Sequence, residues 1–383
     1  MGQRLRGWLG NLILLLCSLS TMLLLCEFVV FRYIFIPDDV LHNVTIDKVV
    51  RYVPNTRAVM RHPDGSTSLI TINAQGWNST KPDYPLAKTP GVARVAIVGD
   101  SYVHGGFIDV DKGFPEILEQ DIALRGGKAE VFRFGIDGAP LSQYLHVVRS
   151  EVVKYKPDVV VIPIIHNDFD ESYRFMHTRT GSSFMKLAAG ADGRVIELPP
   201  SDFKKGMADK LRNFRTFRYL YYKTNAYLKL KWLVSKIYWG GSAEWNEAFI
   251  SSAVDIRNLQ GQDRELETFT RYALEQLKAL SAEHGFQLLF VMDGVREAVY
   301  AGKDAKAYDI GKLNGLMARL TRELDLSFVD LHAAFVQDWQ KQGTRFEFPF
   351  DWHWNELGND IVASVIADQM QPPPSTGDRK SVV

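Results

Sequence analysis

A serine at the end of a predicted strand is the first residue of this chain that could perform covalent chemistry. In the segment VARVAIVGDSYVHG, residues 92–105, an apolar and β-branched run ends in Gly99, Asp100 and Ser101. Such a run predicts a buried parallel strand, and α/β folds place their chemistry at the carboxyl ends of these strands. A serine hydroxyl becomes a nucleophile when a neighbouring base removes its proton. Gly99 permits the tight turn that would expose Ser101, so we predict that Ser101 is a nucleophile.

A histidine near the other end of the chain could be that base. Asp351 and His353 lie in the segment FPFDWHWNELGND. Residues i and i+2 of an extended segment point to the same side, so Asp351 can orient the imidazole while its other nitrogen faces Ser101. An unperturbed imidazole titrates near ~6.5, which suits a general base. The alternative is an aromatic cluster around Trp352 and Trp354 with an incidental histidine.

Two further residues could stabilise a developing oxyanion. Gly138 follows a predicted strand in VFRFGIDGAPLSQ, where a glycine lets backbone N–H groups approach a substrate oxygen, and Gly135 is a rival for this role. Asn167 follows the strand-like run DVVVIPII, and its amide could donate to an oxyanion or cap the next helix. His166 could line the same pocket or lie in the loop.

A metal site is the other chemical option. Asp100, His104, Asp168 and His353 are conceivable ligands, but none shows a recognised zinc spacing such as H-E-x-x-H. We therefore expect neither a metal nor an organic cofactor.

Composition limits the class of protein. The chain has 383 residues, of which 46% are hydrophobic and 23% charged, with a formal net charge of zero. A neutral chain has no global field that favours nucleic acid, so we expect no nucleic-acid partner. The two cysteines, Cys17 and Cys26, both lie in the N-terminal apolar run, which excludes a disulfide framework and a cysteine nucleophile after residue 26.

The elements that must position these residues alternate between strand and helix. Short apolar runs separated by helix-like segments predict an α/β fold with a parallel sheet covered on both faces. The predicted strands are Val92–Val98, Val131–Phe134, Val159–Ile165, Phe286–Met292 and Ser327–Leu331. The predicted helices are Phe114–Arg125, Leu141–Tyr155, Arg264–His284, Ala307–Leu324 and Glu356–Met370. We expect the tail, residues 372–383, to be disordered.

The N-terminus predicts a membrane anchor. No charged residue occurs between Trp8 and Cys26, and about 20 residues suffice for a helix to cross the hydrocarbon core. Arg4 and Arg6 precede this run, which favours a cytoplasmic tip over residues 1–7, an uncleaved transmembrane helix over 8–30 and an exported remainder. The chain would then span the inner or plasma membrane once, with its catalytic domain on the periplasmic side. We interpret residues 31–91 as a stem.

A long insertion, residues 170–262, interrupts the alternation. Its segment Phe203–Trp239 contains ten Lys or Arg residues, ten aromatic residues and a single acid, Asp209. Helical spacing is plausible around Phe214, Phe217, Leu220, Tyr221 and Leu228. The segment could be a lid or collar on an anionic membrane surface, or could grip a glycan. Alternatively, it is a helical pair whose aromatics pack on the domain while its lysines face water.

These motifs, in this order, resemble the SGNH (GDSL-type) hydrolase superfamily over residues 92–371. GDSYVHG is similar to its first block with Ser101 as nucleophile, and Gly138, Asn167 and the pair Asp351 and His353 are similar to the later blocks. The resemblance implies a flavodoxin-like three-layer α/β/α sandwich. It also implies that Ser101, Gly138 and Asn167 form the oxyanion hole and that His353 activates Ser101.

Two departures from the usual pattern bear on the substrate. A single residue, Trp352, separates Asp351 from His353, and this spacing resembles membrane-anchored, polysaccharide-modifying bacterial branches of the superfamily. Ile165 also stands where a glycine usually precedes the asparagine. We expect a serine esterase or O-acyltransferase that acts on acyl esters, acetyl above all, of an envelope or secreted polysaccharide. The alternative is a non-catalytic, glycan-binding component of an envelope assembly.

Overall fold

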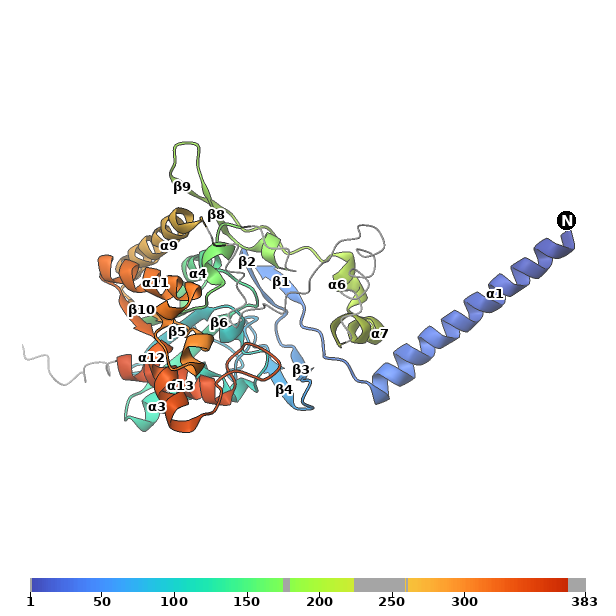
Figure 1. Cartoon of the computed structure of the whole chain (residues 1–383), viewed down its shortest axis with the longest axis horizontal. Helices are drawn as coiled ribbons and strands as arrows, with labels where there is room; N and C mark the ends of the chain where they lie inside the picture. Colours follow the sequence, from blue (N-terminus) through green and yellow to red (C-terminus); the bar gives the residue numbers. More distant parts are fainter. Residues whose placement is uncertain (1, 175–179, 224–258, 260, 371–383) are drawn as a thin grey trace, which may run out of the picture. The chain divides into compact units, whose positions relative to one another are not determined.

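The computed structural model describes residues 2–174, 180–223, 259 and 261–370 of the chain (Figure 1). The chain divides into two compact units. One consists of Met1–Val40 and Lys204–Asn246, and the other of Leu41–Phe203 and Glu247–Val383. We call them the anchor unit and the catalytic unit. The predicted tail, residues 372–383, lies outside the described residues.

A parallel sheet forms the centre of the catalytic unit. Its five strands lie in the order β11-β10-β7-β5-β6, and every pairing is parallel. This is the flavodoxin-like order, in which the chain reverses its direction of winding between the first and third strands of the sheet, β5 and β7. The α/β prediction is therefore confirmed. The strands are β5 (Ala93–Gly99), β6 (Ala129–Gly135), β7 (Val159–Ile164), β10 (Gln287–Met292) and β11 (Ser327–Asp330).

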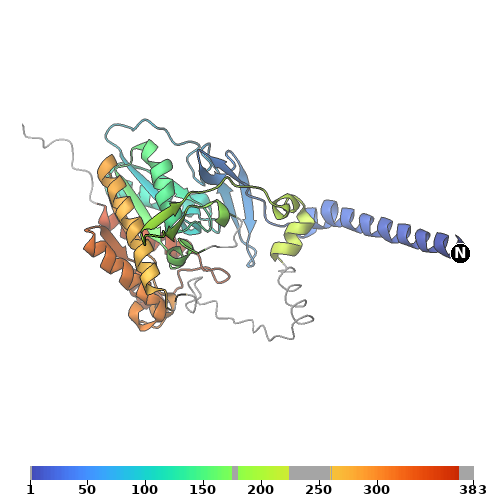
Figure 2. The ribbon, with the colours of Figure 1, turned by 90° about the horizontal axis from the view of Figure 1, so that it is seen from above.

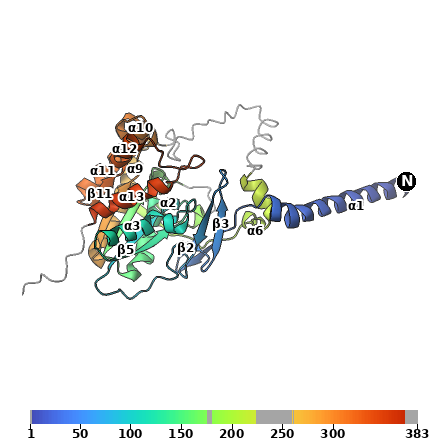
Figure 3. The same ribbon diagram turned by 90° about the horizontal axis from the view of Figure 1, so that it is seen from below.

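Helices cover both faces of this sheet, as Figures 2 and 3 show. Alternate residues of β5 enter two separate cores: Ala96 and Val98 belong to one, and Val95 and Ile97 to the other. The first core is closed by α4 (Leu141–Ser150), α9 (Asp263–His284) and α11 (Lys312–Glu323). The second is closed by α3 (Phe114–Leu124), α12 (His332–Gln342) and α13 (Glu356–Gln369). Shorter helices are α2 (Ser101–His104), α5 (Asp168–Glu171) and α10 (Arg296–Tyr300).

The predicted stem is wrong from Leu41 onward, because these residues belong to the catalytic unit. They form two antiparallel hairpins, β1 (Asn43–Ile46) with β2 (Val49–Tyr52), and β3 (Arg57–Arg61) with β4 (Thr67–Thr71). Val49, Tyr52, Trp77 and Tyr84 are buried in the first core.

A buried ion pair fastens the first hairpin to the sheet domain. The guanidinium of Arg51 on β2 donates two hydrogen bonds of 2.9 Å to the carboxylate of Glu151, just beyond α4. Both side chains are only 3% exposed. Arg51 and Glu151, which the sequence alone would place at the surface, are therefore part of the interior.

The insertion 170–262 is divided between the two units. Its first part forms the hairpin of β8 (Lys186–Ala189) and β9 (Val195–Leu198), and the neighbouring Phe184 and Met185 are buried in the first core. From Lys204 the chain belongs to the anchor unit. The end of the basic, aromatic segment, including Leu228, lies outside the described residues.

The anchor unit contains a long N-terminal helix. This helix, α1 (Gly2–Leu25), continues as the π-helix η1 (Cys26–Ile34). Among the described helices, only the stretch Arg6–Ile34 is long and apolar enough to cross a membrane, and no residue of its most apolar part is buried. The unit also holds α6 (Met207–Leu211), α7 (Arg215–Arg218) and the π-helix η5 (Tyr219–Lys223).

Gly135 is required for packing between β6 and α2. A Cβ at this position would lie 2.2 Å from the backbone nitrogen of His104. We expect Gly135→Ala to lower the free energy of unfolding by about 1–3 kcal/mol, the usual cost of overpacking. Thermal denaturation measures this. Gly315→Ala is the control: Gly315 lies half-buried near the start of α11 with open space around the new methyl group, so the substitution should leave stability equal or higher.

Candidate active site

Ser101, His353 and Asp351 form one hydrogen-bonded chain, although the serine and histidine are 252 residues apart. The Nε2 atom of His353 lies 2.7 Å from Oγ of Ser101. Its Nδ1 atom hydrogen-bonds to Oδ1 of Asp351, which also accepts the backbone N–H of His353 at 2.9 Å. This is the arrangement in which an imidazole accepts a serine proton while a carboxylate fixes its tautomer.

The strand-to-helix turn after β5 presents Ser101. Asp100 caps α2 by accepting the backbone N–H of Tyr102 at 2.9 Å. Ser101 is the first residue of α2, so its amide N–H has no partner within the helix and points beyond the helix N-terminus. The turn lies where the sheet reverses its winding, between β5 and β7, which is where open α/β sheets place their ligands.

Two aromatic rings hold the imidazole of His353. The ring of Tyr102, on α2, has its centroid 4.6 Å from that of His353. Phe107 stacks on the same imidazole at 4.7 Å, with an interplanar angle of 24°. These contacts restrict the ring to the orientation that serves both hydrogen bonds.

The charge distribution favours a basic His353. Burial alone would lower the pKa of His353, but the hydrogen bond and charge of Asp351 outweigh it, so the pKa lies above its usual value. Burial would likewise raise the pKa of Asp351, but the hydrogen bond from His353 outweighs it, and the pKa is lowered. The carboxylate therefore stays ionised and can stabilise an imidazolium at His353.

A buried arginine that sequence reasoning missed holds the loop carrying His353. Arg296, 1% exposed, donates 2.8 and 2.9 Å hydrogen bonds to the carbonyl of Trp352 and the hydroxyl of Tyr102. Its other nitrogen pairs with the buried Asp293 at 2.7 Å. The Tyr102 hydroxyl itself donates to the Trp352 carbonyl at 2.9 Å. Arg296 thereby links α2, which carries Ser101, to the loop that carries His353.

We expect Arg296→Lys to impair catalysis more than folding. Lysine keeps a positive charge beside Asp293 but lacks the planar fork that reaches Trp352 and Tyr102 together. A displacement of about 1 Å at the reacting groups costs about 100-fold in rate, so kcat should fall by about that factor with KM nearly unchanged. Steady-state kinetics on a soluble acetate ester measures the split. Arg125→Lys, at an exposed arginine on the carboxyl end of α3, is the control and should leave kcat unchanged.

The proposed oxyanion residues lie just after the two strands that flank β5. Gly138 follows β6 and Asn167 follows β7, and both strands pair with β5. Gly138 has φ +70°, with no atom within 4 Å of where a Cβ would stand, so this side of the turn is open. Gly135, the other candidate for this role, instead packs closely against the backbone of α2. The roles of Gly138 and Asn167 remain predictions.

Asn167 is oriented by a neighbouring acid. It stands before α5 without a capping hydrogen bond, so its side chain does not serve as a cap for that helix. Its side chain hydrogen-bonds to Glu171. An asparagine amide has two N–H donors, so this contact leaves one for another acceptor.

His166 contacts the helix layer. It is fully buried, and its Nε2 atom lies 2.9 Å from Oδ1 of Asn314 on α11. Asn314 in turn donates to the carbonyl of Asp293 at 2.9 Å. His166 therefore connects the end of β7 to α11.

The side chains that we considered as metal ligands have other partners. Asp168 accepts the Tyr144 hydroxyl at 2.8 Å, and His104 stacks on Tyr52 with centroids 4.4 Å apart. Asp100 caps α2, as above. In the part of the chain that the structure describes, no three His, Cys, Asp or Glu side chains come together as a possible metal site.

Comparison with known proteins shows a similarity in the central part of the chain. The sequence model of the family described as GDSL-like Lipase/Acylhydrolase matches residues 95–238. This range contains Ser101, Gly138 and Asn167 but ends before Asp351 and His353. No curated protein matches the chain.

Several solved structures resemble the chain at low identity. An acetyl xylan esterase, AlAXEase, is 14% identical with a TM-score of 0.41, and the alignment covers 73% of this chain and 100% of that one. A lipolytic protein of the G-D-S-L family from Veillonella parvula is 12% identical with a TM-score of 0.39, over 72% and 97% of the two chains. A lipase/acylhydrolase from Enterococcus faecalis is 14% identical with a TM-score of 0.37, over 74% and 100%.

The family match and the observed geometry complement each other. The match covers the serine block on β5, whereas the fold brings in the histidine and aspartate from beyond the matched range. The central part of the chain is therefore similar to GDSL-like lipases and acylhydrolases.

Proposed function

We propose that the protein is a membrane-anchored serine esterase or O-acyltransferase in which Ser101 forms an acyl-enzyme. The observation that carries this proposal is the 2.7 Å contact between Nε2 of His353 and Oγ of Ser101. As Oγ attacks the acyl carbonyl, His353 takes the serine proton, and Asp351 stabilises the resulting imidazolium. His353 then returns the proton to the leaving alcohol as the tetrahedral intermediate collapses. The acyl group remains on Ser101.

The oxyanion of the tetrahedral intermediate needs preorganised donors. We assign them to the backbone N–H groups of Ser101 and Gly138 and the side-chain amide of Asn167. One such donor contributes about 3 kcal/mol to lowering the barrier. Support comes from the helix-terminal position of Ser101, the open left-handed turn at Gly138 and the spare donor of Asn167.

Resolution of the acyl-enzyme decides between two activities. Water, activated by the same His353, gives an esterase, and a sugar hydroxyl gives a transferase. We assign the substrate to acetyl esters of an envelope or secreted polysaccharide. The support is the single-residue spacing between Asp351 and His353 together with the apolar helix Arg6–Ile34, which would keep the enzyme at the cell envelope.

The acid limb of the pH profile is a direct consequence of the site. The general base must be neutral, and the pKa of His353 lies above its usual value. The kcat/KM for ester hydrolysis should therefore decline as the pH falls through an apparent pKa above ~6.5. Initial rates in overlapping buffers from about pH 5 to about pH 9 bracket the range where imidazole titrates and measure this limb. A limb well below the ordinary imidazole value would show that Asp351 does not support the base.

The proposed polysaccharide substrate is tested in the organism that produces this protein. We expect the acetyl content of its envelope polysaccharide to change when the gene is deleted, and complementation with the Ser101→Ala chain to leave that change in place. Mass spectrometry measures the acetyl content. More acetyl without the protein indicates an esterase, and less indicates a transferase. An unchanged polymer would refute this substrate class while leaving hydrolysis of simple esters intact.

A further inference from the structure

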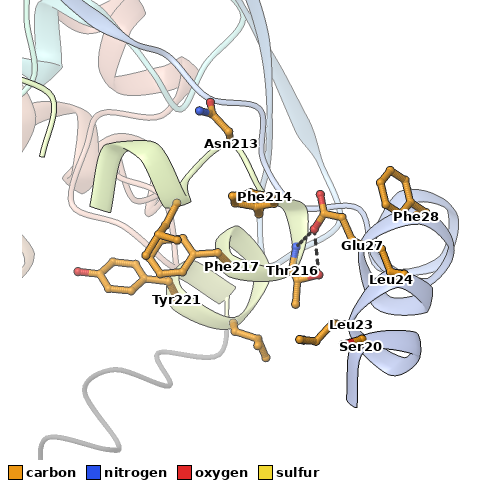
Figure 4. Close-up of a pocket in the computed structure, with 12 residues that line it drawn as sticks. Ser20, Leu23, Leu24, Glu27, Phe28, Asn213, Phe214, Thr216, Phe217 and Tyr221 are labelled. Carbon is orange, nitrogen blue, oxygen red and sulfur yellow. Dashed lines mark hydrogen bonds between the residues drawn. The ribbon is translucent and has the colours of Figure 1, made fainter. Parts of the chain in front are cut away.

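An apolar groove in the anchor unit has no role in the site described above. It has a volume of about 1140 Å³ and is larger than a typical drug-sized pocket, which has about 300–1,000 Å³. One wall consists of residues of the N-terminal helix, and the other of residues on and around α7 (Figure 4). The groove is lined by Ser20, Leu23, Leu24, Glu27, Phe28, Leu211, Asn213, Phe214, Thr216, Phe217, Leu220 and Tyr221.

A carboxylate on the helix holds the second wall in place. Glu27 accepts the backbone N–H groups of Arg215 and Thr216, each at 2.9 Å, and the Thr216 hydroxyl at 3.0 Å. Figure 4 shows Glu27 reaching across to Thr216. Glu27 is the only acidic residue between Arg6 and Ile34, and these bonds satisfy a charge that would be costly in an apolar surrounding.

Aromatic contacts fasten the same segment further along the helix. Tyr219 packs against Phe31 and Phe35 of the helical end, with centroid distances of 4.7 and 5.7 Å. Arg218 donates to the carbonyl of Asp38 at 2.9 Å. The segment 211–221 is therefore attached at Glu27 and at residues beyond Phe28, while the groove itself remains open.

The position of the groove along the helix indicates what fills it. The apolar stretch Arg6–Ile34 has 29 residues, and about 20 are enough to cross the hydrocarbon core. Counted from Trp8, about 20 residues reach Glu27, so in the proposed orientation Ser20 and Leu23 would face the acyl chains of the leaflet on the exported side.

The segment that supplies the second wall is rich in basic residues. The residues 204–218 include Lys204, Lys205, Lys210, Arg212, Arg215 and Arg218 against a single acid, Asp209. Basic residues beside a membrane helix attract anionic headgroups. Apolar wall residues remain exposed: Phe28 and Phe214 by 54% each, and Leu220 by 46%.

We propose that this groove holds an acyl chain of an anionic phospholipid from the membrane that the helix spans, with the headgroup against the basic residues of the segment 204–218. The segment 204–221 would then be an interfacial anchor. It would bind the membrane surface, in addition to the helix that crosses the membrane. This inference rests on the proposed membrane anchoring but is independent of the chemistry at Ser101.

Photo-crosslinking in lipid nanodiscs tests the proposal. The full-length chain is reconstituted with phosphatidylglycerol carrying a diazirine in its acyl chain, irradiated and mapped by peptide mass spectrometry. We expect lipid adducts on peptides that contain Phe214–Tyr221 as well as on the helix, and stronger labelling with phosphatidylglycerol than with a matched phosphatidylcholine probe. Adducts confined to the helix, or labelling at 214–221 no greater than on the β8–β9 hairpin, would overturn the groove. Equal labelling by both probes would overturn the anionic preference.

Matched variants separate the groove from general lipid contact. Leu220→Glu should reduce adducts at 214–221 by about tenfold or more, because it replaces an apolar side chain of the wall with a charged one. Leu198→Glu on β9 is the control, because Leu198 is 45% exposed against 46% for Leu220. Phe214→Ser is the second variant if Leu220→Glu does not fold. Ester hydrolysis should be unchanged in all three.

Carbonate extraction of membranes keeps the two proposals distinguishable. Release of the chain would refute the membrane anchor itself. Retention of the chain without labelling at 214–221 would refute the groove and leave the anchor standing.

Discussion

Replacing Ser101 with alanine is expected to lower kcat/KM for a chromogenic acetate ester by at least about 1,000-fold, because the residual rate comes from binding and oxyanion stabilisation alone. The hydroxyl lies 2.7 Å from its base, and no other serine or threonine contacts His353 among the hydrogen bonds of the described residues. The full-length protein in detergent is the sample, and initial rates are the measurement.

Ser201→Ala is the matched control for this experiment. Ser201 is an exposed serine of the catalytic unit whose hydroxyl donates to a backbone carbonyl. It should retain the full rate. If Ser101→Ala and Ser201→Ala hydrolyse the ester equally fast, the nucleophile lies elsewhere. Equal thermal midpoints for the two variants would exclude misfolding as the cause of a lower rate.

The second large effect is expected from Asp351→Asn, with a loss of about 10⁴-fold in kcat. Asp351 accepts hydrogen bonds from both the ring and the backbone of His353, so the ionised carboxylate fixes the tautomer that leaves Nε2 free to take a proton. An amide can present an N–H to the ring instead, which puts the proton on the wrong nitrogen. The pKa of His353 should also drop, because the charge that raises it is gone. The acid limb of the pH profile should therefore move to lower pH.

Asp368→Asn is the control for Asp351→Asn. Asp368 is 61% exposed on α13 and pairs with Arg125 at the surface. This variant should keep both the rate and the position of the acid limb. If the acid limb of the pH profile stays at the same pH in Asp351→Asn, another group sets the basicity of His353.

The sheet and the residues at its edge could be predicted because local patterns encode them. A buried parallel strand needs a continuous β-branched run, and a residue directly after such a run lies at the carboxyl edge wherever the strand falls in the sheet. This reasoning places Ser101, Gly138 and Asn167 after three strands that prove to be neighbours. The pairing of Asp351 with His353 is similarly local, since two residues separated by one position can share a hydrogen bond.

The supporting shell could not be predicted, because its contacts join distant segments with no periodic signal. Arg296 resembles an ordinary surface arginine in the sequence, yet it is buried against Asp293 and bonds the carbonyl of Trp352, 56 residues away. Only a folded chain brings these groups together.

The stem was mispredicted for a related reason. Short hairpin strands bury alternate residues, so β4 (Thr67–Thr71) looks polar although Ser68 and Ile70 are each 1% exposed. Arg51 and Glu151 add charges that the sequence assigns to solvent but the fold pairs internally. A patch of mixed composition is therefore weak grounds for inferring an extended linker.

The most direct measurement is covalent trapping of the nucleophile. A fluorophosphonate probe incubated with the full-length protein should form a single adduct, and tandem mass spectrometry should map it to Ser101. Labelling should be absent in Ser101→Ala and strongly slowed in His353→Ala, because without the imidazole at 2.7 Å the hydroxyl keeps its proton. An adduct on a different residue, or labelling of His353→Ala at the rate of the unaltered protein, would contradict the assignment of Ser101 and its base.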